Sequence, residues 1–341
     1  MRVETERRAG LVYVTADGAG IRRVRHRQTF RYLDPAGKPV RCADTLARIR
    51  SLVLPPAWAE VWICADDNGH LQAVGVDAKG RKQYRYHARW RADRDDTKFG
   101  QLAAFGAALP RLRARVATHL LKPDLPREKV LAAVVRLLDR THLRVGNPEY
   151  ARTNESFGLS TLRDGHVRFA GDSLRLTFRG KSGVWHDRRL ADRRLAGIVR
   201  ACRDLPGQHL FQYLDAVGDV HAVGSADVNE YVREASDGPF TAKVFRTWAG
   251  TVAATAALAD AAPPATAAAA KRTLAAVVRD VAAKLGNTPA VCRASYIHPR
   301  AVAAFTAGEL AVPVVRRPPA GLTADEARVL RFLRNGGGPG A

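Results

Sequence analysis

The spacing of apolar residues changes near residue 98, and this change limits the possible folds more than any other feature. Between residues 11 and 87 the apolar residues form short runs, as at 61–64 and 71–76, bounded by turn residues. Such runs are typical of strands joined in hairpins. From residue 99 onward the spacing approaches the 3.6 residues of a helical turn. The sequence therefore predicts an α+β protein, with a small β-rich domain over residues 1–90 and a larger, mainly α-helical domain over 98–341.

A charged run lies between the two patterns, and we expect it to be the linker. It covers residues 91–97 and begins Arg-Ala-Asp-Arg-Asp-Asp. The total of 341 residues agrees with two domains, because a domain usually has about 100 to 200 residues. Within the first domain, Asp44 is expected to cap a short helix over 45–53.

Prolines and turns divide the larger domain. Pro110, Pro123 and Pro126 predict breaks between helices, because proline lacks the backbone N–H that an interior helical turn needs. The segments with helical spacing are 99–109, 112–121, 127–143, 192–202, 226–235, 241–258, 267–285 and 323–333. Strand patterns return between 159 and 190, which predicts a small β-sheet inside this domain. The three glycines at 336–338 predict a loose tail.

A large excess of positive charge indicates the kind of partner. The chain has 55 Lys and Arg against 33 Asp and Glu, a formal net charge of +22, which points to a polyanion without saying which one. No stretch approaches the ~20 consecutive apolar residues of a membrane span, and residues 1–8 lack the apolar core of a secretory signal. The four cysteines are far apart and form no Cys-x-x-Cys pair, so we expect reduced thiols and no zinc cluster.

A few residues stand in contexts that a solvated surface does not require. They are Arg144, Lys181, Lys243, Arg246, Asn287 and Tyr296. Arg144 follows an apolar helix beside a glycine, Lys181 sits in a glycine-flanked turn after a strand, and Lys243 and Arg246 share one helix face among aromatic residues. Each has an ordinary explanation, such as a helix-end cation for Arg144 or a half-buried core position for Tyr296.

Together these segments resemble the type IB DNA topoisomerases, and most closely their small bacterial, poxvirus-like members. The matching motifs are Arg-Val-Gly-Asn at 144–147, Phe-Arg-Gly-Lys at 178–181, Thr-Ala-Lys-Val-Phe-Arg-Thr-Trp at 241–248, Gly-Asn-Thr-Pro-Ala at 286–290, Ser-Tyr at 295–296, Leu-Pro-Pro-Ala-Trp at 54–58 and Lys-Gly-Arg-Lys-Gln-Tyr-Arg-Tyr-His at 79–87. The likeness runs from about residue 10 to 310. It implies the catalytic fold that this family shares with tyrosine recombinases. It also implies relaxation of positive and negative DNA supercoils by single-strand cleavage through a 3′-phosphotyrosyl intermediate, strand rotation and religation.

The resemblance assigns roles to individual residues. Tyr296 is the nucleophile, Arg144 and Arg246 bind the scissile phosphate, Lys181 is the general acid, and Lys243 assists near the leaving oxygen. Two guanidiniums can bind the non-bridging oxygens and interact more strongly as the transition state gathers charge. A positioned lysine can protonate the departing 5′ oxygen. Because one phosphodiester is exchanged for another, the implied reaction needs no ATP, and cationic side chains replace an obligatory metal.

One position departs from the family pattern. Asn287, nine residues before Tyr296, stands where many relatives carry a histidine. A neutral amide can donate a hydrogen bond to a phosphate oxygen but supplies no charge. We expect Asn287 to be functional, and His142 and His298 are the weaker candidates if a histidine is required.

The resemblance further implies a DNA-binding surface on the N-terminal domain. Its candidates are Lys79, Arg81, Lys82, Gln83, Tyr84 and Tyr86. Cations alternate there with polar and aromatic groups that suit phosphates and base edges. The simpler interpretation is an exposed edge strand that basic residues protect from aggregation. Tyr150, Arg152 and Lys243 are further DNA-binding candidates in the larger domain.

The expected partner is double-stranded DNA, bound by a monomer whose two domains close around the duplex as a clamp, in the cytoplasm at the nucleoid and away from membranes. Two alternatives remain. A tyrosine recombinase usually has His-x-x-Arg where this chain has Lys-Val-Phe-Arg at 243–246, and usually carries a helical rather than β-rich N-terminal module. A nucleoid-type protein would coat DNA without chemistry, and the set of matched catalytic positions argues against it.

Overall fold

The computed structural model describes residues 7–8 and 10–335, and its contacts divide the chain into two compact units. The first is Met1–Lys98 and the second is Phe99–Ala341. The glycine-rich end at 336–341, predicted to be a loose tail, lies outside the described residues. None of the described helices is both long enough and apolar enough to cross a membrane.

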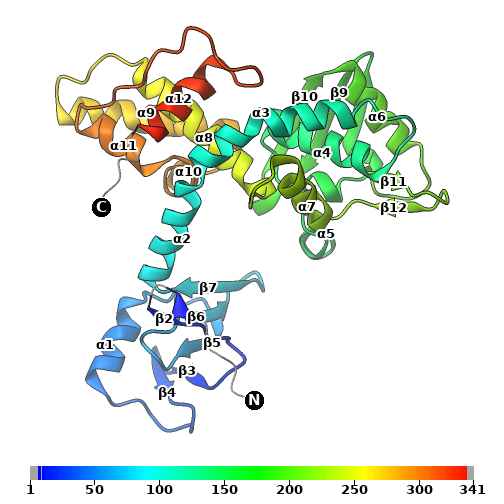
Figure 1. Cartoon of the computed structure of the whole chain (residues 1–341). Coiled ribbons are helices and arrows are strands. Elements are labelled where there is room, and N and C mark those ends of the chain that lie inside the picture. Colours follow the sequence, from blue (N-terminus) through cyan, green and yellow to red (C-terminus); the bar gives the residue numbers. More distant parts are fainter. Residues whose placement is uncertain (1–6, 9, 336–341) are drawn as a thin grey trace. The chain divides into compact units, whose positions relative to one another are not determined.

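A five-stranded antiparallel sheet forms the centre of the first unit (Figure 1). The strand order is β4-β3-β5-β6-β7, with bounds Thr29–Leu33, Gly20–His26, Ala59–Cys64, Leu71–Val76 and Lys82–Tyr86. The short strands β1 (Arg7–Arg8) and β2 (Leu11–Val12) pair beside it, and α1 is Ala43–Ser51. The predicted hairpin of β5 and β6 is confirmed. Ile21, Ile49 and Ile63 are buried at the centre of this unit's core.

Two expectations for the first unit were wrong or incomplete. The residue that precedes α1 is Cys42, and Asp44 lies inside its first turn without capping it. Strand β3 is missing from the predicted strands because four of its seven residues, Gly-Ile-Arg-Arg-Val-Arg-His, are basic. Its first residue, Gly20, must be small: a Cβ there would lie 2.0 Å from the indole nitrogen of Trp62 on the neighbouring strand.

The charged run at 91–97 is helical. It lies within α2, which is continuous from Ala88 to Gly100 (Figure 1). Alternating basic and acidic residues three or four positions apart support an exposed helix, as in the ion pair of Lys98 with Asp95 at 2.6 Å. The segment between the two sequence patterns is therefore an ordered helix in this structure.

Helices make up most of the second unit. They are α3 (Leu102–His119), α4 (Arg127–Thr141), α5 (Pro148–Asn154), α6 (Arg193–Arg203), α7 (Ser225–Ser236), α8 (Ala242–Ala259), α9 (Ala267–Leu285), α10 (Pro289–Tyr296), α11 (Pro299–Thr306) and α12 (Ala324–Arg334). The predicted helices at 127–143, 192–202, 226–235, 241–258, 267–285 and 323–333 are confirmed within a few residues. Helices α5, α10 and α11 escaped the prediction because each is only seven or eight residues long.

The predicted break at Pro110 was wrong. Pro110 lies inside the continuous helix α3. A proline in a helix interior costs about 3 kcal/mol, but apolar residues on both sides of it are buried on one face of α3. These are Leu102, Phe105, Leu109, Leu112 and Val116. Their packing offsets the missing hydrogen bond, which local sequence rules cannot register.

Small antiparallel sheets complete the second unit, as the strand patterns predict. Strands β8 (Val167–Ala170), β9 (Ser173–Arg179) and β10 (Trp185–Ala191) form a three-stranded sheet in the order β10-β9-β8. The tight turn Lys181–Gly183 joins β9 to β10. A second pair consists of β11 (Gln212–Leu214) and β12 (Val220–Ala222).

Helix α8 lies at the centre of the second unit. It packs against α3, α4, α7, α9, α10, α11 and α12 (Figure 1). Most of its residues are buried, including Phe245, Trp248 and one charged residue, Arg246. A guanidinium held inside a packed helical unit needs polar partners, and these partners build the site described next.

Candidate active site

Tyr296 is the last residue of α10 and is only 8% exposed. Helix α10 begins where the Thr288 hydroxyl accepts a hydrogen bond from Val291 N at 3.4 Å, and Pro289 occupies its first turn. Gly250 of α8 allows the end of α10 to approach closely, since a Cβ there would lie 2.6 Å from the Tyr296 carbonyl oxygen. The same carbonyl accepts a hydrogen bond from Thr251 Oγ1 at 3.2 Å. Helix α8 therefore fixes the backbone at Tyr296.

Arg246 of α8 faces this phenol. Its guanidinium carbon lies 5.0 Å from the centre of the Tyr296 ring. One terminal nitrogen donates to the carbonyl oxygen of Leu285 at 2.7 Å, and the other donates to the carbonyl oxygen of His142. Arg246 is 3% exposed, and its Nε has no hydrogen-bond partner within the described part of the chain. Two helix-end carbonyls thus hold the guanidinium through its terminal nitrogens, and the Nε–H stays without a partner in the described part of the chain.

Arg144 and Asn287 form the other side of the site. Arg144 lies in the loop after α4, and Asn287 lies in the turn between α9 and α10. A terminal nitrogen of Arg144 donates to Asn287 Oδ1 at 2.7 Å. The amide nitrogen Nδ2 of Asn287 is buried and has no partner among residues 7–8 and 10–335. The side-chain oxygen is therefore already bonded, and the donor end of the amide is the one left to bind a ligand.

The cluster of Arg144, Arg246, Asn287 and Tyr296 is suited to an anion. Buried donors are almost always paired in folded proteins, and Arg246 Nε and Asn287 Nδ2, which lack a partner in the described part of the chain, can be satisfied by a group rich in acceptors. A phosphodiester has two non-bridging oxygens that accept from such donors. The donor set fits a phosphate, and it contains no carboxylate to repel one.

The electrostatics of the cluster favour ionisation of the tyrosine. Burial opposes it, but the guanidinium of Arg246 and then that of Arg144 outweigh burial, so the pKa of Tyr296 is lowered below its ordinary value. Burial, and secondarily the nearby Arg144, lowers the pKa of Arg246. A phenol with a lowered pKa beside two guanidiniums is a better nucleophile at neutral pH than a solvated tyrosine.

The two histidines considered as substitutes have other contacts. The backbone carbonyl of His142 accepts a hydrogen bond from Arg246. His142 itself adopts a left-handed conformation, with a φ of 55°, at the end of α4. The His298 ring caps α11 by accepting from Arg300 N at 3.1 Å. Burial lowers the pKa of His298 to about 4. His142 therefore contributes its carbonyl to the site, and His298 contributes its ring to a helix cap.

Lys181 and Lys243 both lie on the surface of the second unit. Lys181 is exposed in the turn between β9 and β10, as its glycine-flanked context predicts. Lys243 is exposed in the first turn of α8, three residues before Arg246. The structure brings Arg144, Arg246 and Asn287 around Tyr296 and places the two lysines outside this bonded cluster.

Sequence reasoning missed His186 of β10. Its side chain is buried, 4% exposed, and it lies between the glycine before Lys181 and the glycine before Asn287. The sequence signal was weak, because His186 stands in an ordinary alternating strand, Trp-His-Asp-Arg-Arg-Leu. The two glycines, at 180 and 286, were visible, but nothing local showed that one ring contacts both of them.

The predicted DNA-binding residues of the first unit divide between the two faces of β7, the edge strand of its sheet. Lys82, Tyr84 and Tyr86 alternate on one face, and the Tyr84 and Tyr86 rings stack with centres 6.1 Å apart. Gln83 Nε2 instead donates to Asp77 Oδ2 at 2.9 Å, and Arg81 pairs with the same carboxylate at 2.6 Å. The simpler interpretation of an exposed basic edge strand is correct as a description of structure.

The remaining candidates lie on exposed positions. Lys79 sits in the turn closed by hydrogen bonds to Asp77. Tyr150, 53% exposed, and Arg152 lie on α5, whose N-terminus is capped by Asn147, with Oδ1 accepting from Glu149 N at 2.8 Å.

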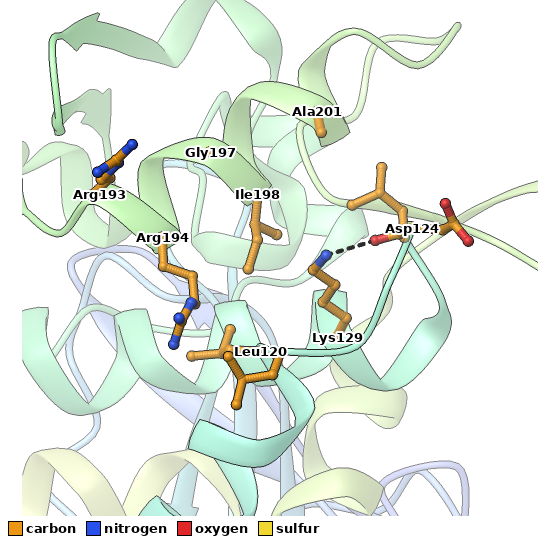
Figure 2. A pocket seen from close by; sticks show the side chains of 10 residues that line it. Leu120, Asp124, Lys129, Arg193, Arg194, Gly197, Ile198 and Ala201 are labelled. Atoms are coloured by element: carbon orange, nitrogen blue, oxygen red, sulfur yellow. Dashed lines mark hydrogen bonds between the residues drawn. The ribbon is translucent and has the colours of Figure 1, made fainter.

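The second unit also has a large surface cleft. Its volume is about 800 Å³, and it lies between the end of α3 and helices α4 and α6. Figure 2 shows Leu120, Arg194 and Ile198 around it, with Lys129 Nζ donating to the Asp124 carbonyl at 2.8 Å. None of the candidate catalytic residues lines this cleft.

Two family models match most of this chain. Residues 87–308 match the family described as eukaryotic DNA topoisomerase I, catalytic core, and residues 29–77 match bacterial DNA topoisomerase IB, N-terminal domain. The chain is 33% identical over 207 residues to DNA topoisomerase 1B of Acanthamoeba polyphaga mimivirus, covering 60% of this chain and 62% of the relative. It is 28% identical over 117 residues to DNA topoisomerase 1B of Vaccinia virus strain Copenhagen, covering 33% of this chain and 36% of the relative. The matched stretches thus span less than two thirds of these relatives.

Proposed function

The chain belongs to the type IB DNA topoisomerase family, and we propose that it relaxes positive and negative supercoils in double-stranded DNA by transient cleavage of one strand. The observation that carries this proposal is the buried Tyr296 beneath the Arg246 guanidinium, in a cluster where Arg144 bonds to Asn287 and where Arg246 Nε and Asn287 Nδ2 have no partner among the described residues. A solvated or structural tyrosine needs neither the two arginines nor unpaired donors.

The proposed reaction is a transesterification at phosphorus. The Tyr296 phenolate oxygen attacks the scissile phosphate, forming a 3′-phosphotyrosyl bond as the bond from phosphorus to the 5′ oxygen breaks. Arg144, Arg246 and the Asn287 amide bind the non-bridging oxygens, and their hydrogen bonds strengthen as negative charge grows in the transition state. Rotation of the nicked duplex then releases supercoils, and the 5′ hydroxyl attacks the phosphotyrosyl bond to reseal the strand.

Lys181 is assigned as the general acid. The departing 5′ oxygen needs a proton. The ammonium of Lys181, at an exposed hairpin turn, can supply it to a duplex bound against that turn. General acid catalysis of this kind contributes roughly 10²- to 10⁴-fold. Lys243 is assigned as an assisting cation near the same oxygen, since it lies one helical turn before Arg246 on α8.

The same proposal covers cofactors, partner and location. The reaction requires no ATP, because one phosphodiester is exchanged for another, and no obligatory metal, because arginines supply the positive charge. We infer a monomer whose two units close around the duplex as a clamp, with Lys79, Arg81, Lys82, Gln83, Tyr84, Tyr86 and Tyr150 contacting DNA. We also infer the catalytic fold shared with tyrosine recombinases and a cytoplasmic location at the nucleoid.

The first test is relaxation of a supercoiled plasmid in EDTA without ATP. We expect wild-type protein to relax the plasmid fully and Tyr296→Phe to lose detectable activity, because the variant keeps the ring but lacks the attacking oxygen. Trapping with denaturant should yield a 3′-linked covalent complex with wild-type protein only.

Tyr213→Phe is the matched control, since Tyr213 lies on β11 and its ring stacks on that of His221, with centres 5.3 Å apart. It should relax DNA at the wild-type rate. Relaxation by Tyr296→Phe, or none by the wild type, would refute the proposal. Binding of DNA without relaxation by either protein would favour the nucleoid-type alternative, and strand exchange between two duplexes would favour the recombinase.

A further inference from the structure

His186 is a buried ring between two segments that the proposed mechanism needs. It belongs to β10, opposite Phe178 of β9, and its ring centre lies 5.2 Å from the Phe178 ring centre. The tip of the same hairpin carries Lys181. The His186 side chain is thus part of the hairpin that presents the proposed general acid.

Two glycines leave room for this ring. A Cβ on Gly180 would lie 2.5 Å from His186 Cδ2, and a Cβ on Gly286 would lie 2.9 Å from His186 Cε1. Both distances are far below an ordinary contact between carbon atoms. Gly180 directly precedes Lys181, and Gly286 directly precedes Asn287. One ring therefore contacts the backbone beside the general acid and the backbone beside the phosphate-binding amide.

A second contact joins the same two elements. Arg188, two residues beyond His186 on β10, donates from its guanidinium to the carbonyl oxygen of Lys284 at 3.0 Å. Lys284 lies in the last turn of α9, just before Gly286. The hairpin is thus attached to the end of α9 at two neighbouring points, one apolar contact and one hydrogen bond.

The charge state of the ring suits its location. Burial, followed by the positive charges of Arg188, Arg144 and Arg246, lowers the pKa of His186 to about 4. The ring is therefore neutral at physiological pH. It can fill the space beside the anion-binding pocket without adding a further positive charge next to the arginines.

We infer that His186 is a positioning residue that holds the Lys181 hairpin against the Asn287 turn, so that the ammonium reaches the leaving 5′ oxygen. The inference rests on the proposed function, because it concerns the acid of that reaction. Misplacement of a catalytic group by about 1 Å costs roughly 10²-fold in rate. A loss of alignment should therefore affect the protonation step more than attack by Tyr296.

The test compares two leaving groups in single-turnover cleavage. One substrate has the natural 5′-bridging oxygen, and the other has a 5′-bridging sulfur, which leaves without a proton. We expect His186→Ala to cleave the oxygen substrate about 100-fold more slowly than wild type, and to recover most of that loss on the sulfur substrate. Lys181→Ala should show the same pattern, and the double variant should be little slower than Lys181→Ala alone.

His166→Ala is the matched control. The His166 ring also packs near Phe178, with centres 6.3 Å apart, but it belongs to the segment before β8 rather than to the hairpin turn. Its variant should show no selective recovery with sulfur. Melting curves establish that each variant is folded.

Gly180→Ala gives an independent approach if His186→Ala is unfolded. Gly180 has a φ of −99°, which alanine tolerates, so its effect comes from the Cβ that would meet the His186 ring. We expect Gly180→Ala, too, to cleave the oxygen substrate slowly and to recover most of that loss in rate on the sulfur substrate. Equal slowing of both substrates, or no slowing, in the folded His186 and Gly180 variants would overturn the inference. Failure of wild-type protein to cleave either substrate would instead overturn the proposed function.

Discussion

Asn287 stands where the family resemblance leads us to expect a histidine in many members. Its Oδ1 accepts from Arg144 at 2.7 Å, which leaves Nδ2 as the donor facing the site. An amide has both an acceptor and a donor, so Asn287 can orient Arg144 and bind phosphate at once. A histidine could donate in the same place, but its charge would add to that of the two arginines.

We expect Asn287→Ala to slow single-turnover cleavage about 10- to 100-fold, since it removes a hydrogen bond to a charged group worth about 1.5–3 kcal/mol. Asn287→Asp is the matched variant, with the same size and no donor. Its carboxylate would pair with Arg144 and repel the phosphate, so it should be slower than Asn287→Ala. Asn287→His should keep most of the activity. An Asn287→Asp variant as fast as wild type would contradict this role for the amide.

The pH dependence of Tyr296 follows from its surroundings. In the free protein, Arg246 and Arg144 lower the pKa of the Tyr296 phenol despite its burial. The charged form is favoured, so Tyr296 should ionise at a pH below the ordinary tyrosine pKa of about 10. The difference in ultraviolet titration between wild-type protein and Tyr296→Phe isolates this phenol from the other tyrosines. Arg246→Gln should move the midpoint upward, and an unchanged midpoint would contradict the electrostatic explanation.

At the scale of elements, the C-terminal helix α12 supports the helix that carries Arg246. It lies beyond residue 308, where the match to the catalytic-core family ends. Glu326 of α12, 7% exposed, accepts from Trp248 Nε1 at 3.1 Å and pairs with Arg113 at 2.8 Å. Because Trp248 follows Arg246 by two residues on α8, α12 is part of the packing that fixes the site.

Removal of the Glu326 carboxylate should destabilise the second unit. We expect Glu326→Ala to cost about 3–5 kcal/mol in the free energy of unfolding, because it leaves the Arg113 charge without one of its buried partners. Asp325→Ala is the control on the same helix, since its pair with Arg328 is exposed and should contribute at most about 1 kcal/mol. Denaturant unfolding measures both, and equal costs would show that the buried network contributes little.

The pH dependence of this network has a definite sign. Burial raises the pKa of Glu326, but hydrogen bonds from Arg113 and Thr323 outweigh burial, and the net pKa is lowered. The stabilisation contributed by the Glu326 carboxylate is therefore complete above the unfolded-state glutamate pKa of about 4.3. It is lost as the pH falls through the lowered folded-state pKa. The difference in stability between wild-type protein and Glu326→Ala should shrink on acidification.

At the scale of the whole molecule, the net charge of +22 acquires two uses. In the proposed function, a few cations form or surround one phosphate site, and the others are available to a longer stretch of duplex. Binding of a duplex should weaken steeply with salt, with log K falling by about 0.9 for each phosphate neutralised against log salt. Fluorescence anisotropy of a labelled duplex at several salt concentrations measures this slope.

A paired substitution separates binding from chemistry at this scale. Lys82→Ala, on the edge strand of the first unit, should reduce the salt slope by about 1 without changing the single-turnover rate at saturating DNA. Lys181→Ala should instead lower the single-turnover rate at saturating DNA and leave the salt slope unchanged. A salt slope unchanged by Lys82→Ala would remove that residue from the duplex contacts.

The sequence by itself determined the division into a β-rich and a helical part, the confirmed helices of the second unit, and the hairpin that presents Lys181. These follow from periodicity and turn residues, which act over a few positions. It also determined the family, because motifs far apart in the chain occur in the right order. The short helices α5, α10 and α11, and the continuity of α3 through Pro110, were beyond it.

Only the tertiary structure decided how the site is held together. Arg246 is fixed by the carbonyls of His142 and Leu285, and Asn287 is fixed by Arg144. The contacts Arg246–His142 and Arg144–Asn287 each join residues more than 100 positions apart in the sequence. Backbone carbonyls carry no side-chain signal, and a ring such as His186 looks like any strand residue until the glycines it contacts are known. The physical reason is that these contacts depend on packing between distant elements, which local propensity and spacing do not encode.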